Sequence, residues 1–222
     1  MRGVFVTGTG TAVGKSMVAA ATCAALAAEG QPVVAFKPVV TGLDEPAGAW
    51  PPDHELLATA AGAEQAPEDV APYRFGPPLS PHYAAELAGQ TIEPARLLSV
   101  ARAAGDRPLV AEGVGGLLVP ITLGYLVRDL AVDLGLPVVI AAHTALGTIN
   151  HTLLTVEAAR AAGLRVAGVV MTPWPARPRP IEVSNRSAVE RLGGVQVSGL
   201  PPTTPQSLAR AGGHLPVADW LR

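Results

Sequence analysis

The chain is poor in cysteine and in charge, and each shortage excludes a class of protein. Cys23 is the single cysteine in 222 residues, which rules out an internal disulfide framework and a cysteine-based zinc site. Charged residues make up 15% and the formal net charge is −2, so we expect no nucleic-acid partner and no binding to an acidic lipid surface. A lone cysteine suits a reducing compartment, and we predict a cytoplasmic protein.

Long hydrophobic runs are also missing. No apolar stretch reaches the roughly 18 residues of a membrane-spanning helix without a breaker, so we expect no membrane segment. The strand-like run Gly3–Thr7 has no basic and then apolar leader before it, so we expect no signal peptide. Aromatic residues are scarce at 4%, yet the hydrophobic total is 49%. A chain of this length buries about 70% of its unfolded surface, and we predict one domain over residues 1–222.

Short β-branched runs alternate with longer runs rich in alanine and leucine, which predicts a mostly parallel sheet with helices on both faces. The expected strands are Val4–Thr7, Pro32–Phe36, Pro108–Glu112, Pro137–Ala142, Arg165–Met171 and Val195–Gly199. The expected helices are Gly14–Glu29, Asp53–Ala61, Pro94–Ala104, Tyr125–Leu134, Thr148–Ala162 and Ile181–Leu192. Left-handed caps are expected where glycine follows or ends such a run, at Gly30, Gly62, Gly105, Gly135, Gly163 and Gly193.

The strongest motif is the glycine-rich loop Gly8–Ser16, GTGTAVGKS, directly after the first strand. Such a loop aims backbone N–H groups at a phosphate, and the following helix N-terminus adds partial positive charge. Lys15 is placed to reach the β- and γ-phosphates, and the Ser16 hydroxyl to bind Mg²⁺. The usual pattern has glycine where this chain has Thr9, so the loop is a variant of the phosphate-binding motif.

Three further charged residues fall at predicted strand ends or helix starts. Lys37 ends the second expected strand, Asp53 opens a helix, and Glu112 ends the third strand. The carboxyl ends of parallel strands form the ligand-binding edge of such a sheet, so Lys37 is placed beside the phosphate loop. Mg²⁺ is bound in proteins through one or two carboxylates plus phosphate oxygens and water. A snorkelling lysine and a helix-capping aspartate are the structural alternatives at Lys37 and Asp53.

The chain resembles the dethiobiotin synthetase family, and the shared motifs occur in the family's order along almost the whole sequence. They are VTGTGTAVGKS (6–16), FKPVVTG (36–42), LSPHYAAELAG (79–89), AEGVGGLLVP (111–120), RDLAVDLGLPVV (128–139), LGTINHTLLT (146–155) and SGLPP (198–202). The segments at 111–120 and 146–155 are far more specific than a phosphate loop alone. The resemblance implies a single-domain P-loop NTPase-like α/β fold.

The resemblance also implies a reaction. Family members use ATP and Mg²⁺ to join CO₂ to 7,8-diaminopelargonate in biotin biosynthesis, through a carbamate and then a carbamic–phosphoric anhydride. The second amine closes the ring and releases phosphate, which yields dethiobiotin and ADP. The family forms a homodimer in which the partner subunit completes each diamine site. This chemistry builds charge on a small anion, where lysines, Mg²⁺ and oriented N–H groups stabilise it.

The family's site residues carry over onto matching positions of this chain. Lys37 and Lys15 match the catalytic lysines, and the Mg²⁺ ligands match Ser16, Asp53 and Glu112. The nucleotide-binding positions implied are Thr11, Ala12, Val13, Gly14, Lys15, Ser16, Val18, Thr172 and Pro173. The substrate-binding positions implied are Thr41 and Gly115, with Leu146, Gly147, Thr148 and Asn150 reaching the substrate from the other subunit.

One position departs from the family pattern. Many members carry an asparagine after the fifth strand that reads adenine, whereas this chain runs Met171-Thr172-Pro173-Trp174. We therefore predict a relaxed or altered base preference, with CTP or another nucleoside triphosphate serving beside ATP. The alternative is that backbone groups of the same loop read adenine. Trp174 suits either stacking on a base or packing in the loop.

Two other protein classes share this plan. A partitioning-type switch ATPase carries an extra lysine just after the first glycine of the loop, and this chain has Thr9 there. Such ATPases also carry a basic amphipathic C-terminal helix that binds membranes, and we expect no such helix in this chain. The amide-forming enzymes of cobalamin biosynthesis usually add a glutaminase domain with a nucleophilic cysteine. Cys23 instead lies in the alanine-rich stretch after the loop, where a small packed residue is expected.

Overall fold

The computed structural model describes residues 1–46, 48–62 and 64–222. Its main sheet is parallel, with strand order β10-β9-β8-β1-β5-β2. These strands are β1 (Gly3–Gly8), β2 (Val34–Phe36), β5 (Leu109–Glu112), β8 (Val138–Ala142), β9 (Val166–Met171) and β10 (Val197–Gly199). The central strand β1 pairs with β5 on one side and with β8 on the other. The phosphate loop that follows β1 therefore lies at the middle of the sheet's carboxyl edge.

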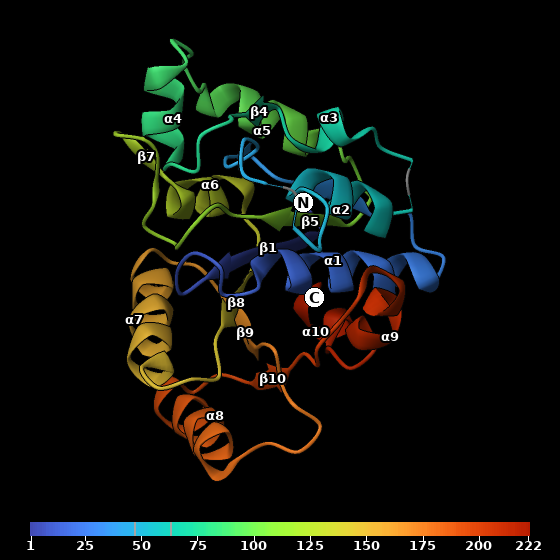
Figure 1. Ribbon diagram of the computed structural model, residues 1–222, viewed down its shortest axis with the longest axis vertical. Coiled ribbons are helices and arrows are strands. Elements are labelled where there is room, and N and C mark those ends of the chain that lie inside the picture. Colours follow the sequence, from blue (N-terminus) through green and yellow to red (C-terminus); the bar gives the residue numbers. More distant parts are fainter. Residues whose placement is uncertain (47, 63) are drawn as a thin grey trace.

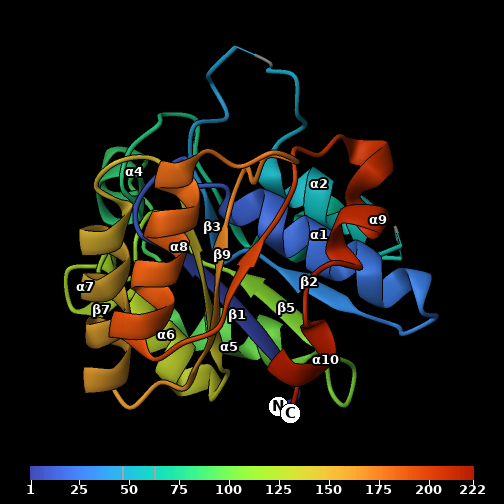
Figure 2. The same ribbon diagram turned by 90° about the horizontal axis from the view of Figure 1, so that it is seen from below.

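Helices cover both faces of this sheet (Figure 1). The longer ones are α1 (Lys15–Ala28), α2 (Asp53–Ala60), α5 (Pro94–Arg102), α6 (Val127–Leu134), α7 (Thr148–Ala161) and α8 (Pro180–Gly193). Figure 2 shows α1, α2 and α9 (Leu208–Gly212) on one side of the sheet, and α7 and α8 on the other. Alternate residues of each strand face opposite layers: Val4 and Val6 pack among α1 and α2, whereas Phe5 packs against α5 and α6.

The structure confirms the predicted fold class. All six expected strands and all six expected helices are present, with ends shifted by at most a few residues. Two details were wrong. The helix expected from Tyr125 begins at Val127, because Tyr125–Leu126 pairs as a short strand instead. The left-handed cap expected at Gly193 lies one residue later, at Gly194 with φ +52°.

Shorter elements complete the chain. Two two-stranded pairs lie outside the main sheet: β3 (Val39–Val40) with β4 (Tyr73–Arg74), and β6 (Pro120–Thr122) with β7 (Tyr125–Leu126). The remaining helices are α3 (Pro67–Val70), α4 (Pro81–Leu87), the 3₁₀ turn η1 (Pro205–Ser207) and α10 (Val217–Trp220). Across the described ranges, every helix is too short or too polar to cross a membrane.

Candidate functional site

The phosphate loop joins β1 to α1 in a tightly wound path. Gly14, the residue before α1, has φ +88°, and Ala12 has φ +56°, a conformation that residues with a Cβ adopt rarely. The backbone N–H of Val18 donates to the Gly14 carbonyl at 3.0 Å and starts the helix. Val13 is buried beneath the loop, whereas Thr11 and Ala12 are exposed. The loop therefore offers its backbone at the surface while its base is fixed in the core.

The Lys15 side chain folds back over this loop. Its Nζ donates to the carbonyl of Gly10 at 2.6 Å, and the residue is 7% exposed. Burial lowers the pKa of the Lys15 ammonium to about 8, and the nearby Lys37 charge adds to this, although Glu112 and Asp53 act in the opposite sense. The ammonium is thus held inside the ring of backbone groups that would surround a phosphate.

A compact polar cluster lies beside the loop, where α1, β2, α2 and β5 meet. Lys37 Nζ donates to Asp53 Oδ2 at 2.7 Å and also contacts Glu112 Oε1. Ser16 Oγ lies 2.7 Å from Asp53 Oδ1 and 2.9 Å from Glu112 Oε1, and its single proton serves one of them at a time. Lys37 is buried, as expected for a group pointing into a site rather than snorkelling to solvent. The structure therefore brings together four of the predicted site residues.

Burial and pairing set the charges of this cluster. Burial disfavours the Lys37 ammonium, but Asp53 and Glu112 outweigh it and raise the pKa of Lys37 above its ordinary value. Burial likewise acts against the Asp53 carboxylate, yet Lys37 and the Ser16 hydroxyl hold the pKa of Asp53 below its usual range. Burial raises the pKa of Glu112, which is 0% exposed, and Lys37 only partly offsets this. A further cation beside Glu112, in addition to Lys37 and Lys15, would offset the remaining cost of burying its carboxylate.

The cluster fits a magnesium ion. Glu112 Oε2 is a buried oxygen with no hydrogen-bond partner among the described residues. With Ser16 and Asp53 it gives an all-oxygen donor set, the kind that Mg²⁺ prefers. No group of three or more histidine, cysteine or acidic side chains gathers at metal distance in the described parts of the chain. The protein thus supplies few ligands, which leaves positions for the waters and phosphate oxygens that Mg²⁺ normally keeps.

Lysine use across the chain is confined to this site. The sequence contains two lysines, Lys15 and Lys37, and every other long cationic side chain is arginine. A lysine ammonium is a compact charge whose donors rotate freely, whereas arginine offers a planar fork. The two positions where the chain keeps lysine are the two buried next to the phosphate loop. Composition alone, counted by residue type, would have pointed to this pair.

The segment after β9, where the predicted nucleotide-binding positions Thr172 and Pro173 lie, is built differently. The Thr172 side chain packs so closely on the phosphate loop that a Cβ at Gly14 would lie 2.4 Å from Thr172 Cγ2. Trp174 donates its backbone N–H to the Leu200 carbonyl at 2.7 Å, and its side chain fills the space beside Gly199. Trp174 is thus a packed residue of this loop. Pro173 follows a cis peptide bond and is exposed.

Two of the predicted substrate residues, Thr41 and Gly115, lie on or next to the lining of a cavity. Thr41 lines a cavity of about 590 Å³ that also reaches Asp53, on the metal-ligand side of the site. Gly115 has φ +62° in the loop after β5, and its neighbour Gly116 lines a second cavity of about 470 Å³. The second cavity is bounded by the phosphate loop, residues 116–119 and the α7 side chains His151, Leu154, Thr155 and Ala158.

The remaining predicted residues lie at the start of α7. Leu146, Gly147 and Asn150 are exposed, and Thr148 is buried with its hydroxyl donating to the His143 carbonyl. Among the described residues, none of them hydrogen-bonds to Lys37, whose partners are Asp53 and Glu112. Sequence reasoning missed the apolar side chains beside them: Leu118 and Leu154 are 53% and 57% exposed. Each leucine lies near the end of a family motif, at 111–120 and 146–155, but its exposure cannot be read from the sequence.

Comparison with known proteins agrees with this geometry. A family described as an AAA domain matches residues 2–209. The chain is 42% identical over 213 residues to the ATP-dependent dethiobiotin synthetase BioD of Anaeromyxobacter dehalogenans, covering 95% of this chain and 94% of that protein. It is 41% identical over 217 residues to the ATP-dependent dethiobiotin synthetase BioD of Agrobacterium fabrum, covering 97% and 95%.

Solved structures share the fold at much lower identity. The cell division ATPase MinD of Pyrococcus furiosus superposes with a TM-score of 0.54 at 17% identity, over 98% of this chain and 90% of that one. This likeness concerns the fold alone. The relatives above are similar over almost their whole length and at far higher identity. From these matches, the chain belongs to the ATP-dependent dethiobiotin synthetase family.

Proposed function

We propose that this protein uses ATP and Mg²⁺ to join CO₂ to 7,8-diaminopelargonate and close the ring of dethiobiotin, with ADP and phosphate as the other products. The observation that carries the proposal is the polar cluster beside the phosphate loop, in which buried Lys37 and Glu112 contact half-buried Ser16 and Asp53. It combines cations for a transferring phosphoryl group with oxygens for a metal, which is what phosphoryl transfer to a small anion needs. Family membership supplies the substrate class.

The two lysines divide the work. Lys15, inside the loop, neutralises the β- and γ-phosphates together with backbone N–H groups. Ser16, Asp53 and Glu112 would hold Mg²⁺, which would supply further neutralisation of the phosphate oxygens. The Lys37 ammonium is assigned to the carbamate. It stabilises the negative charge on the carbamate oxygen as that oxygen attacks the γ-phosphate.

The nucleotide site runs from the phosphate end to the base end. Thr11–Ser16 and Val18 form the loop and first turn around the phosphates, and Thr172 and Pro173 border the base. The position after β9 holds Thr172, which has no amide with which to read adenine. We propose that base choice is relaxed, so that CTP and other nucleoside triphosphates support turnover beside ATP. Backbone recognition of adenine by the same loop is the competing explanation.

The diamine site is proposed to lie between Thr41, Lys37 and the loop at Gly115, and to be completed by a second subunit. Exposed Leu118 and Leu154, which line one cavity, and the exposed Leu146 support this, because exposed apolar side chains that lie together mark an interface. In the resulting homodimer, the segment from Leu146 to Asn150 would reach the substrate bound to the partner. We place this homodimer in the cytoplasm, in line with its single buried cysteine.

Phosphate release tests the proposal. The purified protein is incubated with ATP, Mg²⁺ and bicarbonate, with and without 7,8-diaminopelargonate, and the organic product is identified by mass spectrometry. Release that requires the diamine and yields dethiobiotin is the expected result. Release without the diamine, or none with any nucleotide, would overturn the proposed reaction. Repeating the assay with CTP, GTP and UTP tests base choice, and a strong preference for ATP would favour backbone recognition of adenine.

A further inference from the structure

The loop between β8 and α7 exposes one apolar side chain, and hydrogen bonds within the protein hold its backbone. Leu146, near its end, is 89% exposed. The same loop is closed by the Thr148 hydroxyl, which donates to the His143 carbonyl, and by Gly147 with φ +93°. A leucine held in water by a fastened loop loses little entropy when it meets an apolar surface, so this loop is pre-organised for contact.

A side chain from α8 fastens the loop from the other direction. Asn185 is 6% exposed, and its Nδ2 donates to the Thr144 carbonyl at 3.0 Å and lies 3.5 Å from the Ala145 carbonyl. The buried Asn185 amide is satisfied by this bond, and a buried amide left without a partner would cost free energy. The bond therefore ties the half-buried Thr144 to α8, and with it the neighbouring Leu146.

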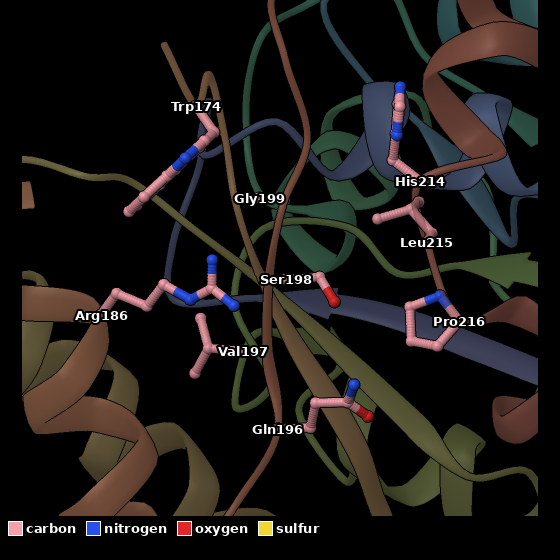
Figure 3. Close-up of a pocket in the computed structure, with 9 residues that line it drawn as sticks. All are labelled: Trp174, Arg186, Gln196, Val197, Ser198, Gly199, His214, Leu215 and Pro216. Atoms are coloured by element: carbon pink, nitrogen blue, oxygen red, sulfur yellow. The ribbon is translucent and has the colours of Figure 1, made fainter. Parts of the chain in front are cut away.

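The α8 helix is a firm support for this amide. Arg160 of α7 donates to the carbonyls of Gly193 at 2.7 Å and Gly194 at 3.1 Å, which ties the C-terminal end of α8 to α7. Next to Asn185, the Arg186 guanidinium lies 5.5 Å from the centre of the Trp174 ring, a cation–π contact. Figure 3 shows Arg186 and Trp174 on the same side of β10. The helix is thus anchored at the residue that follows Asn185 and at its C-terminal end.

We infer that Asn185 is a positioning residue for the diamine site of the partner subunit. It acts through the 143–147 loop, by holding the Thr144 carbonyl so that the segment beginning at Leu146 meets the partner's substrate in one conformation. The inference rests on the proposed function, because it requires a dimer whose sites are shared. It goes beyond that function by assigning a role to a buried residue of α8 that touches neither nucleotide nor metal ligands.

Steady-state kinetics of two variants test the inference. Asn185→Ala removes the donor, and we expect the KM for the diamine to rise about tenfold while kcat and the KM for ATP stay within about twofold. Asn185→Asp keeps the size but places an oxygen against the Thr144 carbonyl, so we expect a rise at least as large. Ser184→Ala, at the exposed neighbouring position in α8, is the matched control with unchanged kinetics.

Mixed dimers separate positioning from a general loss of structure. Two differently tagged subunits, one Asn185→Ala and one Lys37→Ala, are co-expressed and the mixed dimer is purified through both tags. In it, the site that keeps Lys37 receives its loop from the subunit that keeps Asn185. We expect the diamine KM of this dimer to return to within about twofold of wild type, at about half the kcat.

The outcomes distinguish the two proposals. A mixed dimer that keeps the raised KM, a monomeric wild-type protein, or equal losses in kcat and both KM values would overturn the role of Asn185. Wild-type protein without diamine-dependent phosphate release, or Lys37→Ala protein with normal turnover, would instead overturn the proposed function. An active wild type with no rescue in the mixed dimer rejects the positioning role alone.

Discussion

The polar cluster beside the phosphate loop and the loop after β9 are held together in different ways. In the first region, Ser16, Lys37, Asp53 and Glu112 contact one another, and Lys15 donates to the Gly10 carbonyl. In the second region, Thr172 packs on Gly14 and Trp174 packs beside Gly199. The first region depends on particular functional groups, whereas the second depends on close packing. Substitutions in the two regions should therefore have different effects.

The largest effect is expected at Lys37. Lys37→Met keeps the length of the side chain and removes its charge, so we expect kcat to fall on the order of 10³-fold. Without metal, the variant removes the cation that pairs directly with Asp53 and Glu112 and leaves only the nearby Lys15 charge, so the free energy of unfolding should drop by about 3 kcal/mol. Urea denaturation with and without millimolar Mg²⁺ measures this, and Mg²⁺ should restore part of the loss.

Arg210→Met serves as the control for Lys37→Met, because it removes an exposed cation from α9. It should change neither turnover nor stability by much. A Lys37→Met protein with near-normal turnover would contradict the catalytic role. Equal stability of wild type and variant in metal-free buffer would show that the acid pair does not depend on Lys37.

The next largest effect is expected where Thr172 packs on Gly14 of the phosphate loop. Gly14→Ala places a Cβ 2.4 Å from Thr172 Cγ2 and forces alanine to φ +88°, so we expect about 2 kcal/mol of destabilisation. Thr172→Ser removes that Cγ2, so the double variant should recover the part due to the clash and keep the part due to φ. Denaturation of all four proteins in a double-mutant cycle measures both parts. No recovery in the double variant would mean that φ alone makes glycine necessary.

A substitution at Asp53 tests whether this carboxylate is a Mg²⁺ ligand. Asp53→Asn keeps the shape and removes one of two carboxylates, so the Mg²⁺ concentration for half-maximal phosphate release should rise about tenfold. Glu55→Gln, an exposed carboxylate in the same helix, is the control with no expected shift. An unchanged Mg²⁺ requirement with a lowered kcat would restrict Asp53 to pairing with Lys37.

Much of this architecture was predictable from sequence because the main strands are buried on both faces. Strands such as Val138–Ala142 are continuous apolar runs, and glycine stops mark the helix ends between them. The short pairs were not predictable: Val39 meets Tyr73 across a gap of more than thirty residues, and two-residue strands carry no periodic pattern. Likewise, Tyr125–Leu126 pairs with β6 because tertiary contacts override its helical pattern.

The candidate site divides in the same way. Lys37, Asp53 and Glu112 stand at strand ends or helix starts, where topology alone brings them to one edge of the sheet. The close fit of Thr172 on Gly14 and the bond from Asn185 to the Thr144 carbonyl join distant segments through shape. Such contacts depend on distances of a few tenths of an ångström, which no single-sequence pattern records. The positive φ of Ala12 is of the same kind, because alanine carries no signal for that conformation.

The smallest effect concerns the charge of Lys15. Its pKa of about 8 lies below the ordinary 10.5, so the charged form is disfavoured by folding. This cost is present below pH 8 and fades as pH rises toward 10.5. The stability of wild type relative to Lys15→Met should therefore increase across that window. A phosphate, in contrast, needs the charged form, so metal-free nucleotide affinity should fall about fourfold between pH 7 and pH 8.5.

Calorimetric titration at the two pH values measures the affinity, and parallel denaturation measures the stability. Lys15→Met binds nucleotide more weakly at both pH values and should show no such fall, because it has no proton to lose. Opposite trends in stability and affinity, both absent from Lys15→Met, identify one titrating group as their source. An affinity that is flat to pH 8.5 in wild type would mean that the loop's backbone N–H groups, and not the lysine charge, dominate phosphate binding at this end of the site.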